Sequence, residues 1–233
     1  MKLRALISSG LLCLLPCLTS LAFAQQPQQT PEQKSEPPAA KKNARPANEA
    51  DAAEPFDKMS PEQMAGRCVT FETEAGDILV EVLSEAAPES ARNFLNLVST
   101  GAFDTTTFSR VVKGFVVQGG NVATRETLTR ELIRRASRKL PDEPNPVKHL
   151  RGVVSLARPA EANAATTHFF ILLNDSPHLD GTFAAFGRVR TGMEVVDKIA
   201  AGELDGEKPK SPVRVRRAKV ALCQTPPTDR PQK

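Results

Sequence analysis

The sequence lacks most of the residue patterns that identify metalloenzymes, nucleotide-binding enzymes and serine hydrolases. It contains 3 histidines, at positions 149, 168 and 178, and they lack the close spacing of a metal-binding cluster. It has no Gly-x-Gly-x-x-Gly sequence and no P-loop, so no nucleotide is indicated. Ser155 stands in Val-Ser-Leu and not in Gly-x-Ser-x-Gly, which gives a serine-hydrolase interpretation little support. We therefore expect no metal and no cofactor.

A strong excess of charge of either sign is also missing. The 31 Lys and Arg residues and 27 Asp and Glu residues give a net charge of +4. Because nucleic-acid-binding domains usually carry a pronounced basic balance, we expect no nucleic-acid partner. The 19 prolines crowd the two ends of the chain and the apolar residues crowd its middle. This distribution separates a folded central domain from polar flanks.

The first 24 residues have the composition of a secretory signal peptide. Lys2 and Arg4 give a positive start, Leu6–Leu21 is mostly apolar, and Ala22-Phe23-Ala24 fits the small-x-small cleavage rule. We expect cleavage after Ala24 and export to the periplasm or another extracytoplasmic space. The uninterrupted apolar run is short for a membrane span and no charged stop-transfer segment follows it. We therefore expect no stable membrane insertion after cleavage.

Cys17 leaves an alternative open. The sequence Leu14-Leu15-Pro16-Cys17 weakly suggests a lipid-acceptor cysteine, which would anchor the mature protein at Cys17. Pro16 directly before the cysteine fits such a sequence poorly. We therefore favour cleavage after Ala24.

Residues 25–65 are expected to form a disordered linker. They are rich in Gln, Pro, Ala, Glu and Lys, and Phe56 and Met59 are the bulky apolar residues in the stretch up to about residue 60. Such a composition buries too little apolar surface to offset the entropy of the chain. The folded domain is expected to span residues 66–224, and residues 225–233 to form a second disordered, proline-rich tail.

The stretch from Phe108 to Asn121 combines strand-like apolar pairs with two conspicuous polar residues. Val-Val pairs lie on both sides of Lys113-Gly114, which indicates two short strands or one bent strand. Arg110 and Gln118 stand out against these apolar neighbours. A guanidinium is costly to bury without a partner or a function, although the solvent face of a strand would also explain it.

Other segments read as strands. Val69–Glu74 and Asp77–Leu83 flank Ala75-Gly76, which is a hairpin signal. Val213–Leu222 alternates apolar and polar residues as a last strand would.

Two segments read as helices. The first opens near Glu85, has Pro88 in its first turn and stops at Gly101. The second runs from Met193 to Ala201. Many strands with two helices predict a mainly β fold, namely a closed antiparallel β-barrel capped by two α-helices.

Residues 124–151 form an unusually basic segment. They hold 8 Lys or Arg residues against 4 acidic ones, and Leu128, Leu132, Ile133 and Ala136 suggest a short helical stretch. A solvated surface excursion is the simpler interpretation, and a basic patch for acidic clients or anionic surfaces is the alternative. Without interleaved aromatic residues, nucleic-acid binding has little support.

Several motifs, taken in order, resemble the cyclophilin family of peptidyl-prolyl cis-trans isomerases. The resemblance covers roughly residues 66–224 and implies that family's barrel fold and its action on X-Pro peptide bonds. The motifs are Phe108-x-Arg110-x-x-x-Gly114-Phe115-x-x-Gln118-Gly119-Gly120, Ser155-Leu156-Ala157, Phe169-Phe170-Ile171, Leu179-Asp180-Gly181 and Phe186-Gly187.

The resemblance also implies roles for individual residues. Arg110 matches the family's catalytic arginine, and Gln118 matches a polar neighbour that orients it or binds peptide backbone. The implied partners are proline-containing polypeptides, and we expect the protein to act as a monomer. The residues that match the substrate groove are Phe115, Val116, Ala157, Arg158, His168, Phe170, His178, Leu179 and Phe183.

Four of these groove positions depart from better-known members of the family. His168 replaces a common Gln, Phe183 a common His and Arg158 a common Asn, while His178 stands where cyclosporin-sensitive members carry Trp. The changes put rate and preference in doubt more than the type of reaction.

Two cysteines, Cys68 and Cys223, lie outside the predicted signal peptide, which contains the other two. In an exported protein such a pair is a disulfide candidate, and two unpaired thiols are the alternative. The cyclophilin resemblance places the first and last strands close together, so we expect the pair to be joined.

Overall fold

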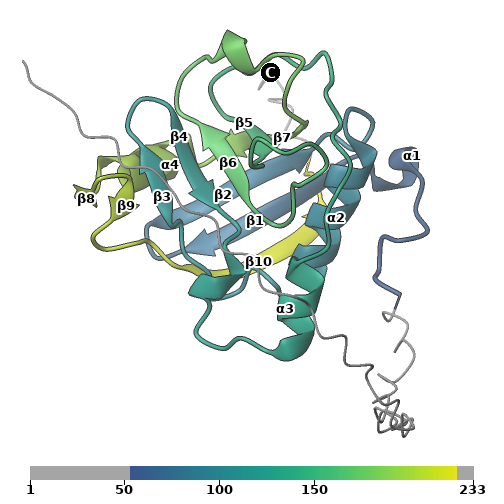
Figure 1. The fold of residues 1–233 in the computed structure, drawn as a ribbon, viewed down its shortest axis with the longest axis horizontal. Helices are drawn as coiled ribbons and strands as arrows, with labels where there is room; N and C mark the ends of the chain where they lie inside the picture. The colour runs from purple at the N-terminus through teal and green to yellow at the C-terminus, as the bar shows by residue number, and fades with distance from the viewer. Residues whose placement is uncertain (1–52, 225–233) are drawn as a thin grey trace, which may run out of the picture. The chain divides into compact units, whose positions relative to one another are not determined.

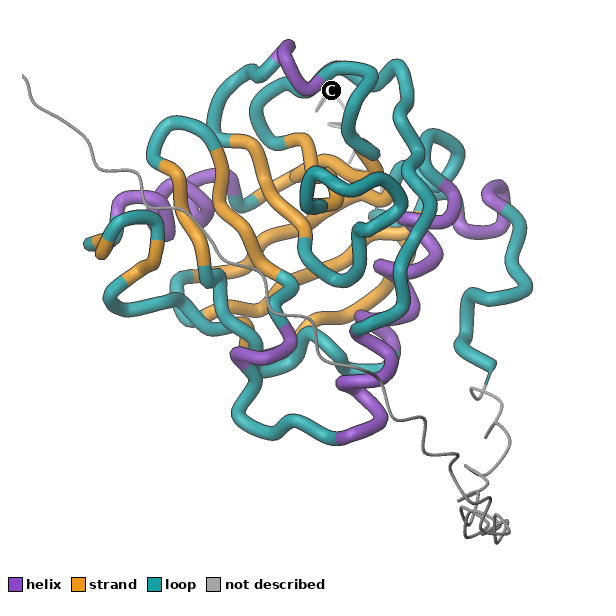
Figure 2. Tube along the Cα trace, viewed as in Figure 1, coloured by secondary structure: helices purple, strands orange, loops and turns teal. Residues whose placement is uncertain are grey.

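The structure is a computed structural model that describes residues 53–224 (Figure 1). The predicted signal peptide, most of the predicted linker and the predicted C-terminal tail lie outside the described residues. The domain is dominated by one antiparallel sheet, and the few helices lie around it (Figure 2).

The main sheet has eight strands in the order β10-β1-β2-β7-β5-β6-β4-β3. A separate two-stranded hairpin, β8–β9, lies beside β3 (Figure 1). The strands are β1 Arg67–Thr73, β2 Gly76–Val82, β3 Arg110–Val112, β4 Val116–Gly119, β5 Val153–Leu156, β6 Phe169–Leu172, β7 Ala185–Thr191, β8 Leu204–Asp205, β9 Lys208–Pro209 and β10 Val215–Leu222.

The described residues contain four α-helices: the two predicted helices, the short helical stretch suggested in the basic segment, and one that was not predicted. α2 (Pro88–Ser99) and α4 (Met193–Ala201) are the expected pair, and the short helical stretch suggested in the basic segment is α3 (Arg130–Ala136). α1 (Pro61–Met64) was not predicted. Two 3-10 turns, η1 (Val122–Thr124) and η2 (Pro177–Leu179), complete the set.

The predicted barrel closure is only approximate, because the sheet curls without a continuous ladder between its edge strands. β3 is only 3 residues long. Its free edge contacts other segments and does not pair with β10, the strand at the other edge of the sheet. Beyond β3, an isolated bridge joins Thr107 to Arg214, and the Phe108 N–H donates to the Val213 carbonyl oxygen at 3.0 Å. The Val111 N–H donates to the carbonyl oxygen of Glu207, in the β8–β9 hairpin, at 2.8 Å. The hairpin thus satisfies backbone groups that an open edge would expose.

The sheet is buried on both faces where it carries β6. Successive strand residues point to opposite faces, and in β6 Phe169 and Ile171 belong to the main core while Phe170 and Leu172 belong to a second, smaller one. The main core is rich in phenylalanine, and its rings include Phe71, stacked 5.4 Å from Phe169. The second core lies on the opposite face of the sheet and forms the floor of the site described below.

The folded part of the chain begins before residue 66, inside the segment predicted to be a linker. Ser60 and Gln63 form a capping box at α1, and this Ser-x-x-Gln spacing is the sequence signal that could have revealed the helix. Phe56 is buried, and its N–H donates to the Asn96 side-chain oxygen on α2 at 2.8 Å. The Arg92 guanidinium donates to the Phe56 carbonyl oxygen at 2.7 Å.

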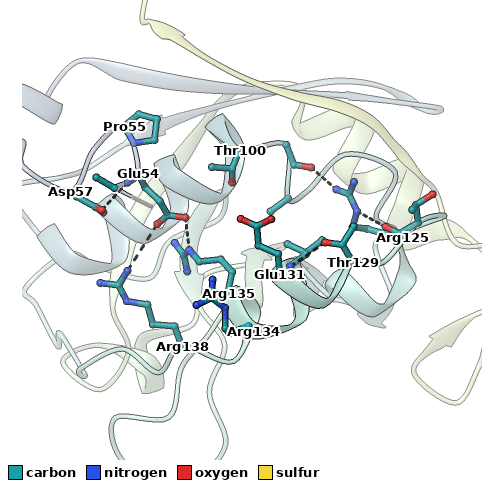
Figure 3. A pocket seen from close by; sticks show the side chains of 15 residues that line it. Glu54, Pro55, Asp57, Thr100, Arg125, Thr129, Glu131, Arg134, Arg135 and Arg138 are labelled. Carbon is teal, nitrogen blue, oxygen red and sulfur yellow. Dashed lines mark hydrogen bonds and ion pairs between the residues drawn. The ribbon is translucent and has the colours of Figure 1, made fainter. Parts of the chain in front are cut away.

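The same N-terminal segment contacts the basic segment. Arg135 of α3 donates to the Glu54 carboxylate at 2.5 Å (Figure 3). It also donates to the Asn93 side-chain oxygen at 2.8 Å. Residues of the N-terminal segment and of α3 line a cavity of about 410 Å³. Part of the positive charge in residues 124–151 therefore holds the fold together.

A carboxylate from the basic segment caps α2. The residue before this helix, Ala87, has no side chain that can accept a hydrogen bond. Glu143 takes that role: its carboxylate accepts from the Glu89 N–H at 2.9 Å, the Ser90 N–H at 2.7 Å and the Ser90 hydroxyl at 2.6 Å. Negative charge at a helix N-terminus is also favoured by the helix dipole.

Replacing Glu143 with alanine should lower the free energy of unfolding by about 1–2 kcal/mol, the usual cost of losing an N-cap. Urea unfolding followed by circular dichroism measures it. Glu161→Ala is the matched control, because that carboxylate is exposed and forms an ion pair with exposed Lys139. Equal stability of the two variants would contradict the capping role.

Cys68 and Cys223 are joined in the structure, as expected. Cys68 lies in β1, and Cys223 follows directly after β10, the neighbouring strand. Their Cα atoms are 4.9 Å apart, within the range that a disulfide spans. The bridge closes the chain between the first and last strands of the main sheet.

Candidate active site

The register of the sheet places Arg110, Gln118 and Phe170 in one row. Arg110 of β3 lies opposite Gln118 of β4, and Gln118 lies opposite Phe170 of β6. Directly opposite residues project from the same face of a sheet. The turn that returns the chain from β3 to β4 contains Gly114, whose φ of +73° is a conformation that glycine adopts readily. Residues of the predicted motifs thus lie side by side on the face of the sheet that carries the second core.

This row borders a cavity of about 540 Å³. Every groove residue predicted from the sequence lines it except His178, whose ring packs 5.6 Å from that of Phe115. Sequence reasoning missed three further lining residues. The lining set is Arg110, Phe115, Val116, Gln118, Ala157, Arg158, Pro159, Ala164, Thr166, His168, Phe170, Leu179 and Phe183.

The floor and one wall of the cavity are apolar. Val116, Phe170 and Leu179 are buried members of the second core, and Phe115 and Phe183 pack against it partly exposed. The Phe170 and Phe183 rings meet edge to face with centroids 5.8 Å apart. A surface of this kind suits a compact apolar ring such as that of proline.

The polar side of the cavity is organised around Arg110. Its Nε donates to the Glu207 carboxylate at 2.7 Å, and its Nη1 donates to Gln118 Oε1 at 3.2 Å. A guanidinium has five N–H donors, so these two contacts with described residues leave donors for a bound amide. The side chain is 41% exposed and therefore accessible to a substrate.

Glu207 is a site residue that sequence reasoning missed. It lies between β8 and β9, 97 residues after Arg110. No local pattern around Glu207 indicates a contact with the predicted arginine. The contact depends on the β8–β9 hairpin lying against β3.

His168 extends the polar network on the other side of Gln118. The Gln118 amide nitrogen lies 3.2 Å from His168 Nδ1. Because Gln118 Oε1 accepts from Arg110, its NH₂ group is the one that faces the imidazole and donates to Nδ1. Burial lowers the pKa of His168, so the ring is neutral at pH 7 and carries its proton on Nε2.

A close backbone approach sets this geometry. Gly120 has φ of +80°, and a Cβ built there would lie 2.2 Å from the Thr167 carbonyl oxygen. Only glycine allows the chain after β4 to run so near the residue before His168. The Gly-Gly pair in the motif therefore brings Gln118 and His168 together.

The activity that the cyclophilin resemblance implies should fall at acid pH, below the usual histidine pKa of 6.5, because burial lowers the pKa of His168. Protonation of His168 would place a second donor opposite the Gln118 NH₂ group and disturb the residue that orients Arg110. The lowered pKa also means that the neutral ring stabilises the fold fully above about pH 6.5, and this stabilisation is lost as the pH falls. The measurement is kcat/KM against pH, with circular dichroism at each point.

His168→Gln is the control for this pH dependence, because it keeps a side-chain acceptor that does not titrate. It should flatten the acid limb of the profile. An acid limb that persists unchanged in folded His168→Gln would show that another group is responsible.

Arg158 also lines the cavity. Its guanidinium sits over the Phe183 ring, 5.2 Å from the centroid, and its Nε is 3.5 Å from the Asp142 carboxylate. These contacts hold a second positive charge beside the apolar wall. This chain therefore offers a cation at the edge of the groove.

Residues 53–224 contain neither a cluster of metal-binding side chains nor a membrane-spanning helix. No group of three His, Cys, Asp or Glu residues among residues 53–224 is placed to hold a metal ion. None of the helices in that range is long and apolar enough to cross a bilayer.

Comparisons with known proteins agree with the geometry of the site. The family model described as cyclophilin type peptidyl-prolyl cis-trans isomerase/CLD matches residues 68–220. Peptidyl-prolyl cis-trans isomerase A of Dickeya dadantii is 33% identical over 164 residues, which cover 65% of this chain and 83% of the relative. Peptidyl-prolyl cis-trans isomerase cypE of Dictyostelium discoideum is 34% identical over 157 residues, covering 66% and 98% respectively.

A solved structure resembles the fold as well. It is a Cryptosporidium parvum cyclophilin type peptidyl-prolyl cis-trans isomerase crystallised in the presence of the dipeptide Ala-Pro. The TM-score is 0.59 at 26% sequence identity, and the match covers 66% of this chain and 98% of that chain.

Proposed function

The chain belongs to the family of cyclophilin-type peptidyl-prolyl cis-trans isomerases, and from this premise we propose that its groove accelerates the rotation of X-Pro peptide bonds. The observation that carries the proposal is a guanidinium, Arg110, beside an apolar cavity of about 540 Å³. The relative crystallised in the presence of Ala-Pro supports a proline-containing ligand.

The reaction needs selective binding of a twisted amide more than it needs a reactive group. Rotation about a peptide bond faces a barrier of about 18–20 kcal/mol because conjugation is lost. X-Pro bonds populate both isomers and exchange over tens to hundreds of seconds. At the top of the barrier the proline nitrogen regains a lone pair, so a donor near that atom stabilises the twisted state. A site that binds this state more tightly than the planar forms raises the rate.

Different residues of the groove contribute to this selective binding of the twisted amide. The proline ring packs on Phe170 and Leu179, with Phe115 at the edge of the pocket. Arg110 donates to the substrate carbonyl and approaches the proline nitrogen. Gln118 and Glu207 hold the plane of its guanidinium through their contacts at 3.2 and 2.7 Å, so the donor needs little reorganisation when the amide twists.

The cellular setting is a second part of the proposal. The N-terminal sequence has the features of a cleaved signal peptide, ending in Ala22-Phe23-Ala24. The Cys68–Cys223 disulfide supports an oxidising, extracytoplasmic compartment. The clients would then be exported proteins that are still folding. N-terminal sequencing of the mature protein tests this part, and a retained Met1 or a lipidated Cys17 would contradict it.

A protease-coupled assay tests the activity. The protein is added to a peptide whose X-Pro bond is cleaved only in the trans form, and the slow phase due to the cis isomer is followed. That phase should accelerate in proportion to protein concentration. Binding of the peptide without acceleration would favour a proline-peptide binding module.

A further inference from the structure

A buried chain of three polar side chains lies beside the proline pocket. His149 Nε2 is 3.0 Å from the Ser155 hydroxyl, and His149 Nδ1 is 3.2 Å from the Asp180 carboxylate. The His149 side chain and Ser155 are 0% exposed, and the Asp180 side chain is 21% exposed. Nothing in the isomerase mechanism above uses these groups.

The three residue types match those of a hydrolytic triad, but the burial of Ser155 excludes that use. A nucleophilic hydroxyl must reach a substrate carbonyl, and Ser155 lies inside the sheet in β5. The network therefore holds parts of the protein together and does not react with a substrate. Buried polar groups of this kind cost free energy unless they are fully paired.

The pairing here is complete and fixes the tautomer of the ring. The Asp180 carboxylate accepts from the His149 backbone N–H at 2.8 Å and from its Nδ1–H. His149 Nε2 then accepts from the Ser155 hydroxyl. Burial lowers the pKa of His149, and the hydrogen bond that His149 donates to Asp180 opposes this shift. The pKa of Asp180 is lowered, first by the His149 backbone N–H and then by Lys148.

Both ends of the network adjoin the proline pocket. Ser155 lies opposite Phe170 in the β5–β6 register, and Phe170 forms the pocket floor. Asp180 directly follows Leu179, which forms the pocket wall at the end of η2. The His149 carbonyl oxygen also accepts from the Ser176 N–H at 2.7 Å, so His149 holds the turn on both sides of Leu179.

We propose that His149 is a positioning residue of the proline pocket. Its hydrogen bonds join the turn that contains Leu179 and Asp180 to strand β5, which lies beside Phe170. This connection sets the width of the pocket. This inference rests on the proposed function. The ring touches no substrate and moves no proton in the reaction. The effect of His149 is on proline binding, because a pocket wall displaced by a fraction of an ångström contacts the proline ring of the substrate poorly.

Three variants test the network. His149→Phe keeps a buried ring and removes both of its hydrogen bonds. Asp180→Ala removes the acceptor, whereas Asp180→Asn keeps an oxygen for both His149 donors. Asp197→Ala is the matched control, since it breaks an exposed ion pair with Arg151 and lies in a different element, α4.

The measurements are KM and kcat on a peptide containing Ala-Pro, and the Kd of that peptide by calorimetry. His149→Phe and Asp180→Ala should raise KM and Kd about fivefold to tenfold and leave kcat within about twofold, the pattern of lost binding without lost chemistry. Asp180→Asn and Asp197→Ala should resemble the wild type. A merely structural role would not produce this split or the rescue by asparagine.

Two outcomes overturn the inference. One is an unchanged Kd in folded His149→Phe or folded Asp180→Ala. The other is a fall in kcat equal to the fall in kcat/KM. If His149→Phe does not fold, the comparison of Asp180→Ala with Asp180→Asn decides the matter, because Asp180 is partly exposed. A wild type that binds the peptide without isomerising it would defeat the proposed function, and the Kd comparison would still test the positioning role.

Discussion

Replacing Arg110 with alanine should lower kcat/KM for an X-Pro peptide by about 10²–10³, comparable to removing one oxyanion-hole donor. The reason is that Arg110 is a charged donor held by Gln118 and Glu207 beside the apolar floor of the cavity. Because its contact with the amide strengthens in the twisted state, kcat should fall more than peptide affinity. The side chain is 41% exposed, so the variant should fold, and circular dichroism checks this.

Two further variants sharpen the test of Arg110. Arg110→Lys should also be poor, because an ammonium group cannot hold Gln118, Glu207 and a substrate in the planar arrangement of a guanidinium. Arg188→Ala is the matched control, since this arginine pairs with Glu81 on the surface of β7 and lines no part of the groove. If folded Arg110→Ala kept more than about a third of wild-type activity, less than about 1 kcal/mol of transition-state stabilisation would have been lost.

Breaking the Cys68–Cys223 disulfide should lower the free energy of unfolding by about 2–4 kcal/mol. The two cysteines are 155 residues apart in sequence, so the bridge closes a loop that contains nearly all residues of the domain. It therefore restricts the conformations of the unfolded chain. The groove lies on other strands, and the reduced protein should keep its isomerase activity at 25 °C. Urea unfolding with and without a reducing agent measures the difference.

The double variant Cys68→Ala, Cys223→Ala serves as the control for reduction. It should match the reduced wild type and show no response to the reducing agent. Identical unfolding midpoints of oxidised and reduced wild type, with two free thiols in the oxidised material, would refute the bridge.

The elements that could be predicted were those with a strong local pattern. α4 begins and ends at the predicted residues because Val195, Val196 and Ile199 have helical spacing and Gly202 follows. The hairpin of β1 and β2 was evident from alternation around Ala75-Gly76. In these segments the local preference and the tertiary structure agree, which makes the sequence readable.

The N-terminal boundary could not be predicted, because it depends on contacts distant in sequence. Phe56 is a single apolar residue in a polar stretch and has no periodicity. Its burial depends on Asn96 and Arg92 of α2, 40 and 36 residues away. The predicted barrel is confirmed only approximately for a related reason: alternation identifies strands, but it does not show which edges meet.

In the site, the residues of the motifs were predicted, and the residues that hold them in position were not. Arg110, Gln118 and Phe170 were found from motifs in order along the chain. Glu207 and the His149–Asp180 contact were not found, because each joins segments 31 or more residues apart without a local signature. Residues that line the groove can thus be recognised from the sequence, whereas the residues that contact and hold them are found only in the structure.

The central claim is that this groove catalyses rotation, and exchange spectroscopy by NMR tests it most directly. A peptide containing Ala-Pro shows separate cis and trans signals, which without a catalyst exchange over tens to hundreds of seconds. With a small molar fraction of the protein, we expect exchange cross-peaks within about a second, and we expect Arg110→Ala to remove them. Peptide signals that shift on binding while the two isomers exchange no faster than in buffer would contradict the account.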